Sequence, residues 1–389
     1  MKNQFKILVL ILITSAMSYS QTRRILQKHI DVDKNTSVIL NFENIYVAIE
    51  ESSDNQIHFE YVMEFHGYSK KEIQDKIDGI KAEVTSYDNI VTLNATSKQQ
   101  VTFVTYEFKG DYGISFEDDF FSSKKDSVIR KSKDSLLAQI RKNNKTNWTR
   151  NPIEYVKGKF KKVDKDGNLS NISKENVDIL RSKFLIKIPS TVKLNINARN
   201  SGIYFRNDLR NEVSITSQQG TIKAKAMTNA YNLVKIDNAN FEAEAIIGGS
   251  YNLKNIKNGK IGSLKDIKIN SEFSKIEIGE IQKETTITDF NSEYFFYNWS
   301  NNFERFSLYS EYSKVHFFYP TQNYSLKVVG HNTKNLFGKN KFEVNMQPTS
   351  KGEKQTMMVK EADKDKKSEG QIFFDIVHGI IVSYSHSLN

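Results

Sequence analysis

The side chains of this chain that could bind a metal ion are its histidines and its acidic residues, because it has no cysteine. Its seven histidines are scattered, and no pair has the spacing of a His-Glu-x-x-His zinc motif. They are His29, His58, His66, His316, His331, His378 and His386. A scattered histidine usually lies at the surface or forms a satisfied hydrogen bond in the core, so we expect neither a metal site nor another cofactor.

One acidic segment resembles a calcium-binding loop. Asp164, Asp166 and Asn168 occupy positions one, three and five of a twelve-residue segment that ends at Glu175. The sixth position, where the sharp turn of such a loop needs glycine, is Leu169, and no helix is evident before the segment. We therefore interpret the segment as a hairpin turn, with calcium binding as the alternative.

A second acidic group, Glu117, Asp118 and Asp119, lies between phenylalanines in the stretch FEDDFF, residues 116–121. Paired carboxylates can serve acid–base chemistry or bind a cation, but a solvated loop is the simpler interpretation. The sequence has no nucleophile elbow, phosphate-binding glycine loop or dinucleotide motif. We expect a protein that is not an enzyme.

The positive charge is concentrated in one segment. Between Ser122 and Lys162, 13 basic and 3 acidic residues give a charge of +10, so the rest of the chain is near neutral. A predicted amphipathic helix over 126–141 carries much of this charge. The candidate patch for an anionic ligand is Arg130, Lys131, Lys133, Arg141 and Lys142. Anionic glycolipid or acidic polysaccharide would suit it, and a solvated face that binds nothing is the alternative.

The first twenty residues have the features of an export signal. Lys2 and Lys6 precede the apolar run Ile7–Met17, and small residues stand before Gln21. The apolar run is too short to span a bilayer, and no later segment is long and apolar enough. We predict a mature chain from Gln21 without a transmembrane segment, located in the periplasm, on the outer membrane surface or outside the cell. Nucleic acid is not an expected partner of such a chain.

Three stretches repeat one pattern: INSEFSKIEIG (Ile269–Gly279), ITDFNSEYFFY (Ile287–Tyr297) and LYSEYSKVHFF (Leu308–Phe318). Two apolar positions two residues apart are followed, seven residues later, by two more. Further copies are Leu194, Ile196, Ile203 and Phe205; Val213, Ile215, Ile222 and Ala224; and Val234, Ile236, Phe241 and Ala243, with a gap two residues shorter. The six intervals from Ile196 to Leu308 average about 18.7 residues.

This pattern predicts two short strands per repeat, each with one buried face, joined by a polar corner. One such unit cannot bury its apolar face, whereas stacked units share a core. We therefore predict a mainly β fold, a single-stranded right-handed β-solenoid with coils of about 19 residues and an α-helical basic insertion. An antiparallel β-sandwich is the alternative.

The pattern also occurs near both ends of the mature chain, at Val38, Leu40, Val47 and Ile49 and at Ile372, Phe374 and Ile381. We divide the chain into a signal peptide (1–20), an N-terminal β part with one helix (21–103), the basic and partly helical insertion (104–183), the coils (184–330), and C-terminal strands with a charged loop (331–389).

Two segments outside the coils have clear local signals. Ser69 and Glu72 form a capping box, and Ile73, Ile77, Ile80 and Val84 then share one helical face. The charged run Lys360–Gly370 predicts a mobile loop between the last strands.

The most aromatic coil offers a candidate binding surface. Because strand residues alternate in and out, Phe295 and Tyr297 should face outward, near Trp299, if Tyr294 and Phe296 face the core. Exposed aromatic faces suit sugar rings or protein partners. The alternative is that a neighbouring loop covers them.

The chain resembles the bacterial putative-adhesin family of β-solenoid type, the group that includes the auto-transporter adhesin head domain. The resemblance rests on the exported start, on the stretch His29–Tyr61 and on the stretch Phe184–Asp208, with Pro189 and Asn200–Gly202 where the first coils of such proteins have them. It implies a secreted or envelope-associated right-handed solenoid without a cofactor. The basic insertion and the aromatic coils depart from the pattern.

Together these features predict an exported, non-enzymatic, adhesin-like protein that presents a binding surface at the cell envelope. Two alternatives remain open. One is a polysaccharide-active β-solenoid enzyme that acts on an anionic glycan, and the other is a structural or regulatory envelope protein that binds another protein.

Overall fold

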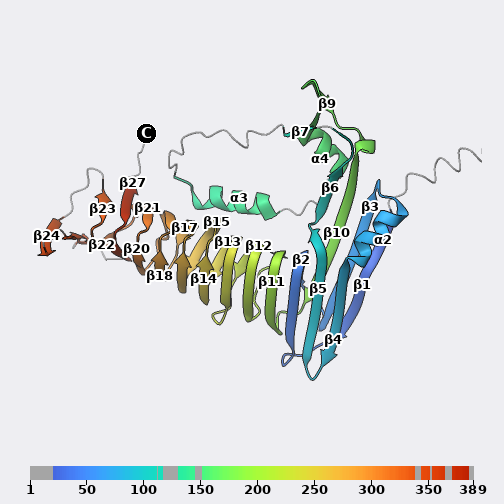
Figure 1. Cartoon of the computed structure of the whole chain (residues 1–389). Helices are drawn as coiled ribbons and strands as arrows, with labels where there is room; N and C mark the ends of the chain where they lie inside the picture. Colours follow the sequence, from blue (N-terminus) through green and yellow to red (C-terminus); the bar gives the residue numbers. More distant parts are fainter. Residues whose placement is uncertain are drawn as a thin grey trace, which may run out of the picture.

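The computed structural model describes residues 21–111, 113–116, 130–144, 151–337, 343–350, 353–363 and 370–384. The predicted signal peptide (1–20) and residues 117–121 of the acidic stretch lie outside this range. The described chain is elongated, with its N-terminal strands at one end, a row of short strands along its length, and the last strands at the other end (Figure 1).

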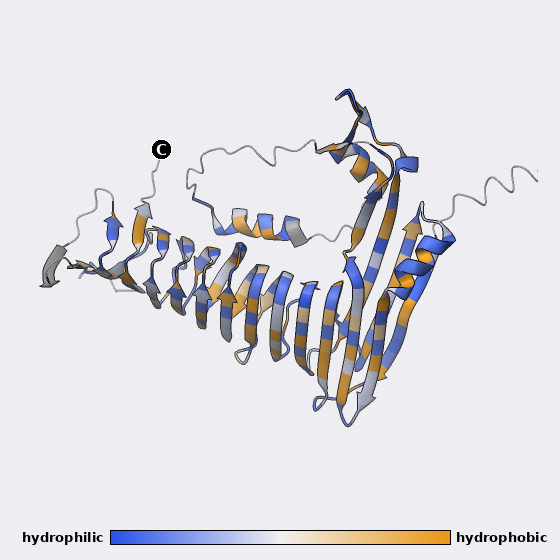
Figure 2. Cartoon of the chain, viewed as in Figure 1, coloured by the Kyte–Doolittle hydropathy of each residue, from blue (hydrophilic) through white to orange (hydrophobic). Residues whose placement is uncertain are grey.

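The protein is mainly β, as the sequence predicts, and one mixed, largely parallel sheet contains 24 of its strands. Along the described strands apolar and polar residues alternate, which gives the banded colouring of Figure 2. The N-terminal elements are β1 (Gln21–Asp31), β2 (Ser37–Glu51), β3 (Gln56–His66), α2 (Lys70–Asp78), β4 (Ile80–Tyr87), β5 (Ile90–Val101) and β6 (Val104–Phe108). Those of the insertion and the following strand are β7 (Gly113–Phe116), α3 (Lys133–Asn144), α4 (Pro152–Lys159), β8 (Phe160–Val163), β9 (Leu169–Asn171), the 3-10 helix η3 (Lys174–Asn176) and β10 (Val177–Ile188).

The central and C-terminal parts are made of strands alone in the described range. They are β11 (Lys193–Phe205), β12 (Val213–Met227), β13 (Leu233–Ile247), β14 (Ser250–Lys254), β15 (Asn258–Lys265), β16 (Ile267–Glu272), β17 (Lys275–Ile281), β18 (Glu284–Phe290), β19 (Glu293–Trp299), β20 (Arg305–Glu311), β21 (Lys314–Phe318), β22 (Tyr324–His331), β23 (Lys334–Leu336), β24 (Glu343–Ser350), β25 (Glu353–Lys360), β26 (Gly370–Val377) and β27 (Ile380–Tyr384).

The repeats stack in register, each paired in parallel with the next. One column of inward residues shows this: Ile196, Ile215, Val234, Tyr251, Ile269, Ile287, Leu308 and Phe374 are partners in successive strands. All are at most 1% exposed. From Ile196 to Leu308 the column takes six steps, so the predicted mean repeat is confirmed. An antiparallel sandwich is wrong for this region, because β11 to β21 pair in parallel.

One repeat has a different register from the one that the sequence predicts. The sequence pattern aligned Val234 with Val213 and Ile236 with Ile215. In the structure Val234 pairs with Ile215 and Ile236 pairs with Ser217, so both are shifted by two residues along the neighbouring strand. The shorter gap of this repeat results from that offset, because Phe241 still pairs with Ile222. The hydrophobic pattern alone did not distinguish a shortened corner from a shifted strand.

The apolar patterns at the two chain ends belong to the same stack. β2 pairs in parallel with β11, and β20 pairs in parallel with β26. The coil formed by β26 and β27 lies between two others. On one side it pairs with β20 and β21, and on the other side with β22 and β23. The N-terminal part adds antiparallel pairs, β1 with β3, β3 with β10, β4 with β5 and β6 with β10.

The capping box at Ser69 is present: its hydroxyl accepts from the backbone N–H of Glu72, whose carboxylate accepts from the backbone N–H of Ser69. The helix is shorter than predicted, however, because it ends at Asp78, and Ile80 and Val84 lie in β4. The residues that the sequence pattern assigned to the end of the helix instead form β4, which pairs with β5.

The predicted insertion begins and ends inside the large sheet, since β6 and β10 pair with each other. Between them, β7, β8 and β9 form a small antiparallel sheet, and α4 begins at Pro152 with Asn151 as its N-cap. The described part of the predicted basic helix is α3, which begins at Lys133 and lies over β13, β15 and β17 (Figure 1). Residues 364–369 of the charged run lie outside the described range.

A buried carboxyl group lies in the core of the C-terminal coils. Asp289 is 6% exposed and accepts hydrogen bonds from the hydroxyls of Ser271 and Ser313, the latter at 2.5 Å. The hydroxyl of Tyr294 lies 2.5 Å from that of Ser271. Burial raises the pKa of Asp289, although the serine donors oppose the shift.

Candidate binding surfaces

α3 covers one outer face of the coils. Ser132 caps its N-terminus, since its hydroxyl accepts from the backbone N–H of Ser135 at 3.0 Å. Leu136 and Ile140, one turn apart, are fully buried against Phe295, Tyr297 and Phe318. The apolar stripe of α3 therefore faces the strands.

Two glycines make the close approach of α3 possible. A Cβ atom at Gly262 would lie 2.4 Å from Cδ2 of Leu137 and 2.3 Å from the backbone oxygen of Glu244. One at Gly279 would lie 2.4 Å from the backbone oxygen of Gly262 and 3.3 Å from Cδ2 of Leu136. Any larger residue at these positions would push α3 and the neighbouring coil apart.

The predicted anionic-ligand residues lie at this interface, and four of the five contact the coils. Lys131 forms an ion pair with Glu277, Lys133 pairs with Glu280 at 2.7 Å, and Arg141 pairs with Glu244 at 2.8 Å. Arg130 donates to the side-chain oxygen of Asn298 at 2.8 Å.

Among the five, only Lys142 has no contact of this kind in the described structure, and its side chain is exposed. The basic segment thus complements acidic side chains of the coils. That these residues also bind an anionic ligand stays a prediction.

The predicted aromatic surface is also covered. Phe295 and Tyr297 point away from the central core, as the alternation requires, but they are only 7% and 3% exposed because α3 lies over them. Trp299 belongs to the central core and donates from its indole nitrogen to the backbone oxygen of Phe318 at 2.7 Å. These three side chains therefore do not form an exposed surface, which corrects the prediction.

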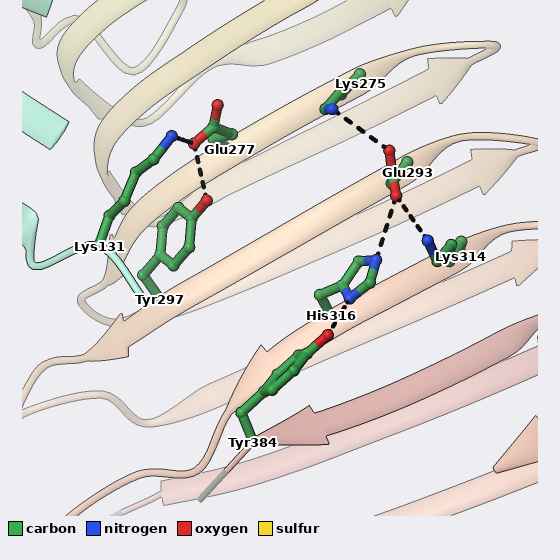
Figure 3. A network of polar contacts seen from close by, with 8 residues as sticks. All are labelled: Lys131, Lys275, Glu277, Glu293, Tyr297, Lys314, His316 and Tyr384. Atoms are coloured by element: carbon green, nitrogen blue, oxygen red, sulfur yellow. Dashed lines mark hydrogen bonds and ion pairs between the residues drawn. The ribbon is translucent and has the colours of Figure 1, made fainter. Parts of the chain in front are cut away.

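A polar network continues across the same face (Figure 3). Glu293 accepts from Lys314 at 3.1 Å and from Nε2 of His316 at 3.2 Å, and Lys275 lies 3.7 Å from its other oxygen. Nδ1 of His316 lies 2.7 Å from the hydroxyl of Tyr384, and the imidazole stacks on the ring of Phe295 at a centroid distance of 4.5 Å.

Charges in this network are fixed by burial and by the lysines. Burial, followed by the charge of Lys314, lowers the pKa of His316 and keeps the imidazole neutral. Burial favours the neutral acid at Glu293, yet the bond from Lys314 and the other positive charges outweigh it and lower its pKa. The His316 side chain is 3% exposed, so its imidazole has no open access for a substrate, and its bonds to Glu293 and Tyr384 join β19, β21 and β27.

Exposed aromatic side chains gather instead at the corners between the two strands of successive coils. Phe273, Phe290 and Tyr312 are 48%, 38% and 51% exposed. Their ring centroids are 5.4 and 5.9 Å apart, and the ring of His378 stacks on that of Tyr312 at 5.1 Å. We call these four residues the corner ridge, and it extends along the stacking direction over four coils.

The backbone at these corners is unusual. One corner residue of each coil has a positive φ, and in most coils it is an asparagine, the non-glycine residue that adopts this conformation most readily: Asn44, Asn200, Asn238, Asn255, Asn291 and Asn332. Phe273 and Tyr312 adopt φ values of 49° and 58° at the equivalent corners. A bulky residue there costs about 1–2 kcal/mol, and such retained strain is concentrated at functional sites.

A shallow hollow of about 410 Å³ lies beside the ridge. Phe273 and Tyr312 line it together with Lys257, Lys275 and Lys314. Glu293 lines it as well. This hollow is therefore an open depression with aromatic walls and an excess of positive charge.

The sequence contained a signal for this ridge. The stretches Ile269–Gly279, Ile287–Tyr297 and Leu308–Phe318 have an aromatic residue within the seven-residue gap, at Phe273, Phe290 and Tyr312 respectively. The corner that the sequence pattern predicts to be polar therefore carries an exposed aromatic side chain in three coils.

The other sequence candidates do not form sites in the described structure. Asp164 accepts from the backbone N–H groups of Asp166 and Asn168 at 2.9 and 2.8 Å, which builds the tight turn between β8 and β9. These bonds lower the pKa of Asp164. No group of three or more potential metal ligands is brought together among the described residues. No helix in the described range is long and apolar enough to span a membrane.

Comparison with known proteins gives little further information. No family model matches the chain, and no curated protein matches it. The crystal structure of a putative cell adhesion protein from Clostridium sporogenes matches with 10% sequence identity, covering 94% of this chain and all of the other, at a TM-score of 0.18. Because this TM-score is far below that of a shared fold, the proposals below are based on the geometry of the chain itself.

Proposed function

We propose that this chain is an exported, non-enzymatic, adhesin-like protein that binds its target at the cell envelope through the corner ridge. One observation carries the proposal. The outward aromatic residues of the coils are covered by α3 on one face, whereas Phe273, Phe290 and Tyr312 are exposed in a row and two of them occupy strained backbone positions. Exposed aromatic rows of this kind are used for recognition, because stacking requires accessible rings.

The scaffold that presents the ridge is proposed to be a single-stranded β-solenoid. The parallel register with steps of 17 to 21 residues from Ile196 to Leu308 supports it. A right-handed path is expected, since crossover connections between parallel strands are right-handed in about 98% of cases. Such a scaffold places equivalent corner residues one strand spacing apart, about 4.8 Å, and thereby forms an extended binding edge.

A binding role fits the described polar groups better than a catalytic one. On the coils, the imidazole of His316 is buried and held on both nitrogens by Glu293 and Tyr384. The acidic coil residues Glu244, Glu277 and Glu280 are paired with the basic residues of the α3 segment. The corner ridge and the hollow beside it instead present mainly aromatic and basic side chains.

The proposed location is outside the cytoplasm, in the periplasm, on the outer membrane surface or beyond the cell. It is supported by the charged start and the short apolar run of residues 1–20. The partner is then an envelope polysaccharide, a glycolipid or an envelope protein.

Binding of the mature chain, residues 21–389, to isolated envelopes of its native host tests the proposal. Phe273→Asn, Phe290→Gln and Tyr312→Asn, combined in one variant, remove the three Phe and Tyr rings of the ridge and place at two corners the residue that other coils use. A matched control changes two exposed tyrosines elsewhere, Tyr87 and Tyr231, which are 79% and 75% exposed, to Asn.

We expect the ridge variant to lose at least tenfold in apparent affinity and the control to bind like the wild type. Equal binding by the ridge variant and the wild type would refute the proposal. Shortening of the polysaccharide fraction during incubation would instead indicate the enzymatic alternative.

A further inference from the structure

We infer that the hollow beside the corner ridge is a binding site for an acidic polysaccharide, whose sugar rings contact the aromatic side chains and whose carboxylates contact the lysines. This inference rests on the proposed function and specifies its ligand. It starts from the residues that line the hollow: Lys257, Phe273, Lys275, Glu293, Tyr312 and Lys314.

The aromatic and the charged residues form two parallel rows. Lys275, Glu293 and Lys314 are register partners in β17, β19 and β21, and Lys275 and Lys314 follow Phe273 and Tyr312 by two residues. Each of these two coils therefore offers one aromatic ring and one ammonium group at the same corner. A ligand that matches both rows has an apolar face and a charge that recur at regular intervals along its length.

The charge in the hollow favours an anion. Three lysines and one carboxylate line it, which gives a formal charge of +2. Glu293 is held by Lys275 and Lys314 at 3.7 and 3.1 Å and also by His316, so the single carboxylate is neutralised within the structure. The side chains of Lys275 and Lys314 remain 49% and 47% exposed, so their ammonium groups are accessible to a ligand.

The shape favours a polymer of sugars over a small anion. The hollow is shallow and open, and the exposed rings of Phe273, Phe290 and Tyr312 have centroids 5.4 and 5.9 Å apart along the stack. A pyranose ring has a flat C–H face that packs on an aromatic side chain, and a uronic acid adds one carboxylate per sugar. A chain of uronic acids therefore presents an apolar face and a negative charge with the repetition that the two rows require.

The experiment measures binding of the mature chain to polygalacturonate, a linear polyuronate, and to the same polymer after reduction of its carboxyl groups. We expect the wild type to bind polygalacturonate at least tenfold more tightly than the reduced polymer, and to lose affinity as salt is raised. A variant with Lys257, Lys275 and Lys314 changed to Gln should lose at least tenfold toward polygalacturonate and little toward the reduced polymer. Phe273→Asn with Tyr312→Asn should lose affinity for both.

The matched charge control changes three exposed lysines away from the ridge, Lys34, Lys165 and Lys187, to Gln. It should bind within about twofold of the wild type. Equal loss in this control and in the ridge lysine variant would overturn the inference, because only the overall charge would then matter. Preferential binding to vesicles of phosphatidylglycerol would overturn it as well, in favour of a lipid surface.

The outcome also distinguishes this inference from the proposed function. If polygalacturonate does not bind, while envelope binding still depends on the aromatic ridge and not on the three lysines, the ligand class is wrong and the binding role stands. If envelope binding is independent of the ridge, both are wrong. Circular dichroism melts of each variant verify that the coils are folded, and the asparagine variants should be at least as stable as the wild type because asparagine suits a positive φ.

Discussion

Replacing the two buried anchors of α3 should release the helix from the coils without unfolding them. Leu136 and Ile140 are fully buried against an aromatic cluster that is separate from the central core. Truncation of a buried Leu or Ile to Ala costs about 2–5 kcal/mol, and the lower end applies at the edge of a structure. At about 2 kcal/mol each, the two truncations together should cost about 4 kcal/mol, and their contact with the same cluster lets the total depart from the exact sum.

The remaining contacts cannot compensate for that loss. A helix of 12 residues is marginal in isolation. The three ion pairs of the α3 segment, at Lys131, Lys133 and Arg141, are partly exposed, and such pairs contribute at most about 1 kcal/mol each. The double variant should therefore populate a state in which α3 is undocked and the aromatic face is open.

Hydrogen–deuterium exchange of the mature chain measures this directly. In the Leu136→Ala, Ile140→Ala variant, amides of residues 133–144 should lose most of their protection, while those of β16 to β19 keep it. Lys142→Ala, on the exposed side of the same helix, is the matched control and should leave protection unchanged. Wild-type protection of residues 133–144 in the double variant would refute the reasoning, since the anchors would then not hold the helix.

Three further predictions concern the core and the leader. Ile269→Asp buries an unpaired carboxylate at a position that is 1% exposed and should destabilise the protein by several kcal/mol. Glu272→Ala removes a half-exposed ion pair with Lys254 and should cost under about 1 kcal/mol. Equal melting temperatures of the two variants would mean that the buried and exposed faces are wrongly assigned. Burial raises the pKa of Asp289, so its contribution to stability is fully present below the unfolded pKa, near 4, and is lost as pH rises through the folded pKa. In chemical denaturation, Asp289→Asn should therefore gain stability relative to the wild type as pH rises from 4 to 7. A stability difference that stays constant over this range would contradict the prediction. Intact mass of the protein from its native host should give Gln21 as the first residue, and a secreted form that retains residues 1–20 would contradict the leader prediction.

Local and periodic features of the fold could be predicted from the sequence because they depend on residues close in the chain. The alternation around Ile269 and Ile287 determines which face is buried, and the capping box at Ser69 determines where α2 begins. The mean repeat follows from the same alternation. The register of Val234 and the end of α2 at Asp78 depend on pairing with another strand, which the local pattern does not contain.

The candidate site was harder to predict because it depends on what covers each face. Phe295 and Tyr297 face outward as expected, yet a helix more than 150 residues earlier in the chain buries them. Its basic residues find their partners at Glu244, Glu277 and Glu280. Gly262 and Gly279 in the coil strands are the sequence features that indicate a close contact with α3. A glycine in a strand is also compatible with a simple bend, so they do not identify the contact by themselves.

The most direct test of the central claim, that the corner ridge is the binding surface, is to map where a bound ligand protects the chain. Hydrogen–deuterium exchange is measured on the mature chain with and without the polysaccharide fraction of its native envelope. Protection should appear at the corners, residues 272–275, 290–293 and 311–314, and should be absent in the variant that lacks the ridge aromatics. Protection confined to α3 or to the N-terminal strands, with unchanged corners, would contradict the account.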